Sequence, residues 1–149
     1  MAITQSMATS FKVEILDGIH NFGVGVIRAS TAADTFKIAL YTSSATLSAA
    51  TTAYTTSNEV VGTGYTAGGN TLVVSTVPVS SGTTAYLSFS NTSWSTASIT
   101  ARGAMIYNST QSNKCVAVLD FGSDKTSTAG TFTIVFPTAD ATDAIIRIA

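Results

Sequence analysis

Residues 99–107 read Ile-Thr-Ala-Arg-Gly-Ala-Met-Ile-Tyr and alternate along the chain. In an extended conformation the odd-numbered residues, Ile99 through Tyr107, share one face, and the even-numbered residues share the other. A period of two is typical of a β-strand with one buried face and one exposed face. This stretch therefore predicts a β-strand.

The same alternation recurs from residue 35 to the end of the chain, and turn-forming residues separate the segments. Ser80-Ser81-Gly82 predicts a tight hairpin, and Phe121–Lys125 with Ala129–Gly130 predicts a further connection. Pro137 is expected to end a strand. Short, evenly spaced strands predict an all-β fold, an antiparallel β-sandwich with jelly-roll topology, or alternatively an immunoglobulin-like sandwich. About eight strands are predicted, at 36–40, 59–61, 72–77, 84–89, 99–107, 115–121, 132–136 and 144–148.

The start of the chain has a different pattern. Residues 1–10 are small and polar, and we expect an N-terminal arm that becomes ordered when it docks. Apolar residues from Phe11 to Ile19 fall at helical spacing, and Gly18 would stop a helix there. A strand alternation fits Phe11–Ile15 equally well. No linker divides the remainder, so residues 11–149 are predicted to form a single β-sandwich domain.

The chain carries little charge. Charged residues make up 10% of its 149 residues, against roughly 25% in a typical protein, and the net charge is −1. The seven basic residues are scattered singly, which argues against nucleic acid or an anionic membrane as a partner. The segment 42–58, rich in Ser, Thr and Ala, predicts a long loop.

One cysteine, Cys115, excludes an intrachain disulfide, and its apolar neighbours predict a buried small hydrophobe. The first residues show no secretory signal, and no apolar window is long enough to span a membrane. We therefore expect the chain to be made and to mature in a cytoplasm.

The sequence offers no recognisable catalytic, cofactor-binding or metal site, so we predict that the protein is not an enzyme and uses no cofactor. His20 is the only histidine, and a packing or turn role is favoured over a hydrolase role. A zinc site needs three or four ligands, and the sequence supplies one cysteine and one histidine. The glycine run 62–70 precedes a predicted strand and has no lysine, so it predicts turns and not a phosphate loop. The spacing of the aspartates matches no recognisable calcium loop, and a role in solvated loops is favoured over calcium binding or a glycosidase pair. The carboxylates concerned are Glu14, Glu59, Asp120, Asp124, Asp140 and Asp143.

Several aromatic residues fall outside the core alternation, and Tyr and Trp are common at binding surfaces. Trp94, between Ser93 and Ser95, is the first candidate for an exposed contact residue. A carbohydrate-binding module that uses Trp94 and exposed tyrosines is therefore an alternative function. The tyrosines concerned are Tyr41, Tyr54, Tyr65, Tyr86 and Tyr107.

Residues 34–47 read Asp-Thr-Phe-Lys-Ile-Ala-Leu-Tyr-Thr-Ser-Ser-Ala-Thr-Leu, and Thr52-Ala53-Tyr54 and the segment 58–69, Asn-Glu-Val-Val-Gly-Thr-Gly-Tyr-Thr-Ala-Gly-Gly, follow. This pattern resembles a family of small structural proteins of tailed bacteriophages, most strongly over residues 18–75. Some members are similar to capsid cement or decoration proteins, small β-domains that bind the outside of the shell as trimers or dimers. The resemblance implies no catalytic residues.

The resemblance implies a virion structural protein, a capsid cement protein that is a homotrimer or homodimer and binds the major capsid protein. A tail, baseplate or fibre component is the structural alternative. We expect residues 1–10 to contact the shell. The apolar strand 144–148 must be paired or covered.

Overall fold

The computed structural model describes residues 3–8, 10–11, 15, 18–24 and 33–148. These residues form an all-β fold of two antiparallel sheets, as predicted. The five-stranded sheet has the order β1-β7-β6-β2-β3, and the three-stranded sheet has the order β4-β5-β8. The jelly-roll strand order is not confirmed by this arrangement. The strands are β1 (Ser6–Met7), β2 (Phe36–Tyr41), β3 (Asn70–Leu72), β4 (Val74–Ser81), β5 (Thr84–Phe89), β6 (Thr92–Asn108), β7 (Lys114–Ile134) and β8 (Ile146–Ile148).

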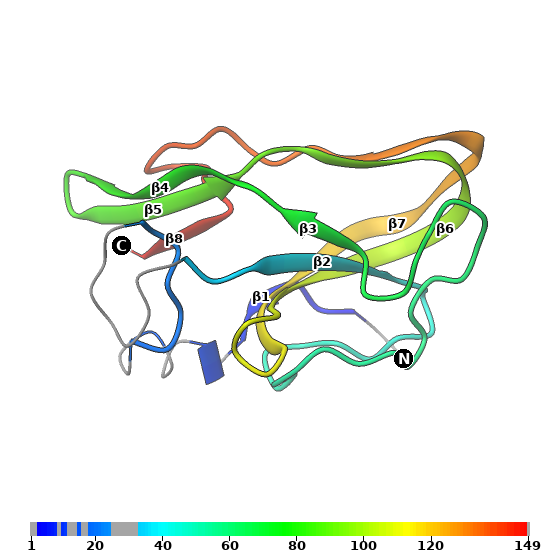
Figure 1. The fold of residues 1–149 in the computed structure, drawn as a ribbon, viewed down its shortest axis with the longest axis horizontal. Helices are drawn as coiled ribbons and strands as arrows, with labels where there is room; N and C mark the ends of the chain where they lie inside the picture. Colours follow the sequence, from blue (N-terminus) through cyan, green and yellow to red (C-terminus); the bar gives the residue numbers. More distant parts are fainter. Residues whose placement is uncertain (1–2, 9, 12–14, 16–17, 25–32, 149) are drawn as a thin grey trace.

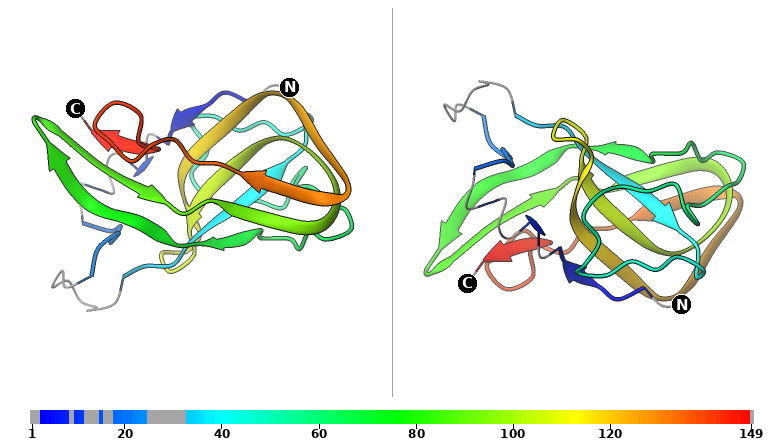
Figure 2. Two further views of the ribbon diagram at one scale, coloured as in Figure 1. Left: turned by 90° about the horizontal axis from the view of Figure 1, so that it is seen from above. Right: turned by 90° about the horizontal axis from the view of Figure 1, so that it is seen from below.

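β6 and β7 are the longest strands of the fold. They pair along almost their whole length, and they bend together so that their two halves lie in different layers (Figures 1 and 2). Register shifts at the bend, between Trp94 and Ile99 and between Ala101 and Gly103, increase the local twist. The sandwich therefore closes around a bent hairpin and not between two separate flat sheets.

The predicted break between two strands at 115–121 and 132–136 is wrong, because β7 runs through it. Gly122, with φ of 75°, and Ala129, with φ of 49°, lie in the predicted connection, and the structure places both at irregular positions within the strand. β7 has 21 residues and β6 has 17, so extra residues on β7 are taken up as bulges.

The predicted single strand at 72–77 is wrong, because the chain is divided at Val73 between β3 of the larger sheet and β4 of the smaller sheet. The predicted strands at 36–40, 84–89, 99–107 and 144–148 are confirmed with changed limits. The hairpin at Ser80–Gly82 joins β4 to β5, with Gly82 at φ of 58°. The predicted strand at 59–61 is only an isolated bridge between Glu59 and Tyr41, and the segment 42–58 is a loop held to the sheet by single bridges.

At the start of the chain, Ser10, Phe11 and Ile15 are helical, which favours the predicted helix over a strand. Gly18 has φ of 66° and its N–H donates to the carbonyl of Ile15 at 3.0 Å, which is how a glycine ends a helix. The rest of 12–17 lies outside the described residues.

Residues 3–8 of the predicted N-terminal arm dock on the domain itself, and the expected contact of the arm with a shell stays a prediction. β1 is the edge strand of the larger sheet beside β7 (Figure 1). Ile3 and Ala8 are buried. Thr4 and Gln5 are exposed, so they are the residues of this segment that a partner can reach while it stays docked.

Candidate interaction surface

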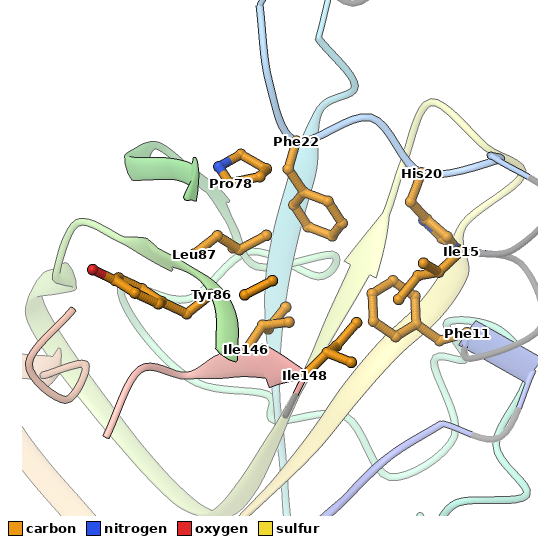
Figure 3. Close-up of a pocket in the computed structure, with 10 residues that line it drawn as sticks. Phe11, Ile15, His20, Phe22, Pro78, Tyr86, Leu87, Ile146 and Ile148 are labelled. Carbon is orange, nitrogen blue, oxygen red and sulfur yellow. The ribbon is translucent and has the colours of Figure 1, made fainter. Parts of the chain in front are cut away.

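An apolar groove lies between the three-stranded sheet and the segment around residues 11–22 (Figure 3). Its volume is about 180 Å³. On the sheet side, the cross-strand pair Leu87 and Ile146 is buried, and the next pair on the same face of the sheet, Ala85 and Ile148, is exposed. The groove therefore runs from the core to the surface along β5 and β8. The side chains of Phe11, Ile15, His20, Phe22, Pro78 and Tyr86 complete its lining.

Aromatic packing holds the wall opposite the sheet. The ring of Phe22 stacks on Phe36 of β2 with centroids 4.2 Å apart. Phe11 meets the ring of His20 edge to face at 4.7 Å. Because Phe36 belongs to the core of the larger sheet, this contact fixes the wall to the body of the domain.

A hydrogen-bond network sets the orientation of His20. The side-chain oxygen of Asn108 accepts from the backbone N–H groups of Thr110 and Gln111, both at 3.1 Å, so its amide nitrogen faces the other way. That nitrogen donates to Asp34 Oδ2 at 2.8 Å and lies 3.0 Å from His20 Nδ1. Nδ1 of His20 is therefore an acceptor. In a Ser-His-Asp triad the same nitrogen donates to a carboxylate, so this geometry gives the hydrolase alternative no support.

Exposed valines extend the apolar surface beyond the groove. Val77 of β4 is 51% exposed, and Ile148 of β8, whose cross-strand partner is Ala85, is 49% exposed. Val24 lies beside Val77 and Pro78, where they line a second hollow. Monomeric proteins seldom expose apolar residues in contiguous groups, and such groups mark interaction sites. We call the groove and these exposed residues the small-sheet face.

Charge is absent from most of this face. Between Lys37 and Arg102 the only charged residue is Glu59, which is buried. β4 and β5 therefore contribute no charge to the surface, and Arg147 is the only charged residue on β8. An uncharged apolar centre is typical of the core of a protein–protein interface.

Glu59 lies elsewhere, in a cluster of tyrosines that fastens the long loop to the sheet. Its Oε1 accepts from Tyr65 Oη and the Gly68 N–H, both at 2.7 Å, and its Oε2 accepts from Tyr54 Oη at 2.6 Å. Tyr107 Oη donates to the Gly68 carbonyl at 2.8 Å. With three donors, the carboxylate is committed to structure.

The tyrosines of this cluster resist ionisation. Burial, followed by the charge of Glu59, raises the pKa of Tyr107 to about 12. Burial is also the largest cause that raises the pKa values of Tyr41, Tyr54 and Tyr65 well above the ordinary value, and Glu59 adds to it. The neutral hydroxyls are therefore the stable form of the cluster.

The other acidic residues do not assemble into a site within the part of the chain that the structure describes. Asp120 bonds to the Gly122 N–H at 3.0 Å and to Arg102 Nε at 3.1 Å, and these contacts, the backbone bond first, lower the pKa of its carboxyl. Asp140 accepts from the backbone of Thr142 and Asp143 and closes a turn. No group of three His, Cys, Asp or Glu residues could hold a metal there. Glu14 lies outside the described residues.

Trp94 is not exposed, and that expectation is wrong. Its side chain is 4% exposed and packs against Phe132 and Tyr65. Trp94 faces inward because the bend of β6 and β7 encloses it, and the flanking Ser93 and Ser95 are the exposed residues. A carbohydrate platform built on Trp94 is therefore excluded. Cys115 is buried, as predicted.

The glycine run 62–70 forms turns before β3, as predicted. Gly68 and Gly69 have φ of 90° and 65°, a conformation that favours glycine, and Gly69 packs directly on the backbone of Ile38. No helix in the described part of the chain is long and apolar enough to cross a membrane.

Comparison with known protein families, curated proteins and solved structures finds no match to this chain. The resemblance to phage structural proteins therefore remains a prediction from residues 18–75.

Proposed function

We propose that this protein is a virion structural protein of a tailed bacteriophage, a cement or decoration protein that binds the major capsid protein and stabilises the shell as a homotrimer. The sequence resemblance over residues 18–75 supports this proposal. The all-β fold is compatible with it.

The observation that carries the proposal is the small-sheet face. It combines a groove that opens to the surface, exposed apolar side chains, and two strands without charge. Burying these side chains against a partner is favourable by about 25 cal/mol per Å² of apolar area, and no charge has to be desolvated on β4 or β5.

A repeated partner suits such a face. Each copy on a symmetric shell meets the same surface, and contacts between neighbouring copies add to the affinity because they form at high effective concentration. A face of modest size is therefore sufficient for stable decoration.

Quantitative mass spectrometry of purified virions of the phage that encodes the chain tests the proposal. We expect a copy number comparable to that of the major capsid protein. A copy number comparable to that of tail or baseplate proteins would favour the tail alternative, and absence of the polypeptide from virions would refute a structural role.

A further inference from the structure

β1 and its flanking residues are held on the domain like a bound peptide. The segment Ile3–Ala8 lies along the edge of β7, where β1 pairs with Ala117 and Val118 in antiparallel register. The N–H of Ala8 donates to the Val116 carbonyl at 3.2 Å, and the N–H of Thr4 donates to the Leu47 carbonyl at 3.0 Å. These contacts extend a sheet by one short strand, as in recognition by β-strand addition.

The contact is specific because the side chain of Ile3 fills a space on the surface of the sheet. The side chain of Ile3 is 7% exposed and lies over Gly103 of β6. A Cβ atom at position 103 would collide first with the backbone carbonyl of Leu119, and it would also lie 3.0 Å from Ile3 Cδ1, closer than side chains normally approach. Gly103 therefore provides the space that Ile3 fills. Gln5 adds a contact, since its side-chain oxygen accepts from the Asp120 N–H at 3.3 Å.

We propose that this strand is exchangeable between copies: β1 of one molecule occupies the edge of β7 in its neighbour. Six consecutive residues, Ile3–Ala8, make all the contacts described above, so the same segment from a second copy makes the same contacts. Exchange then changes little in contact energy, and the local concentration of copies decides which form dominates. The inference rests on the proposed function in one respect, because a capsid shell would supply the high local concentration of copies.

The pair Met7 and Ala117 offers a direct test. Because Ala8 and Val116 share a main-chain hydrogen bond, the adjacent pair Met7 and Ala117 is a non-hydrogen-bonded pair with Cα atoms roughly 4.5 Å apart, within reach of a disulfide. Cys115, which lies in the same strand, is first replaced by alanine.

One variant carries Met7→Cys and the other Ala117→Cys, both with Cys115→Ala. They are mixed at increasing concentration, oxidised, and separated by non-reducing electrophoresis. We expect a disulfide-linked heterodimer whose yield rises with concentration. A chain with both cysteines should form the intrachain disulfide at low concentration, which shows that the pair can react.

Ile3→Asp in the Met7→Cys molecule is the matched control, because it removes the apolar side chain at position 3 and leaves the cysteine in place. It should lower the heterodimer yield roughly tenfold, given the value of burying an isoleucine. Exchange is refuted if the heterodimer fails to form at millimolar protein while the intrachain disulfide forms, or if Ile3→Asp leaves its yield unchanged. Neither result depends on virions, so exchange and decoration can fail separately.

Discussion

Glu59 shows how one residue fixes a long segment. Its carboxylate accepts hydrogen bonds from two tyrosine hydroxyls and one backbone N–H. Glu59 and these partners all lie in the part of the chain between β2 and β3. Tyr65 Oη in turn accepts from the Leu40 N–H at 2.9 Å, which connects the cluster to β2. The sequence holds a signal for this role, because a single charge within so long an uncharged segment is unusual. Glu59 is a candidate catalytic carboxylate by residue type alone, and its structural use was not predicted.

Glu59→Ala should lower the free energy of unfolding by about 3 kcal/mol, because it leaves buried donors without an acceptor. Glu59→Gln should lower it less, since one acceptor oxygen is retained. Urea denaturation measures both. Asp124→Ala, at an exposed position, is the control and should change stability by no more than about 0.5 kcal/mol. A Glu59→Ala protein as stable as the control would contradict the assigned role.

The tyrosine cluster predicts a loss of stability in alkali. The pKa of Tyr107 is about 12 in the folded protein and about 10 in the unfolded chain, so the folded state holds this proton more tightly. Its stabilising contribution is complete below pH 10 and is lost as the pH rises from 10 through 12, because the unfolded chain releases the proton first. Tyrosinate absorbance and circular dichroism, followed together, should show these tyrosines ionising as the fold is lost. Ionisation near pH 10 with the fold intact would be the opposite result.

At the scale of elements, alternation predicted most strands correctly because a half-buried strand needs a period of two. It failed for β7, where Gly122 and Ala129 resemble turn residues. Positive φ serves a bulge within a strand as well as a turn, and only the pairing with β6 distinguishes the two cases. β1 was missed because two paired residues give no period.

Ala129→Gly should stabilise the protein by about 0.5–1 kcal/mol, because Ala129 has φ of 49° and glycine adopts that conformation without strain. Ala67→Gly, at an exposed position in a loop, is the control and should leave stability unchanged or lower it. Thermal unfolding compares the two. Destabilisation by Ala129→Gly would show that the alanine side chain matters more than its backbone strain.

At the scale of the whole molecule, the groove could not be predicted from the sequence. Its lining comes from residues 11–22, 78–87 and 146–148, and only the tertiary fold brings these segments together. The low charge of the chain is visible from its composition. That the uncharged strands β4 and β5 are neighbours in one sheet is known only from the strand order. The expectation of a binding surface followed from composition, whereas its location did not.

The most direct test of the central claim measures binding to capsid shells that lack the protein. The double variant Val77→Asp, Ile148→Asp places charge on the small-sheet face, and Val61→Asp places charge at a 95% exposed valine elsewhere. Co-sedimentation with the shells should show at least tenfold weaker binding for the double variant and unchanged binding for Val61→Asp, with similar unfolding temperatures for both. Equal binding by the folded double variant would contradict the claim that this face holds the partner.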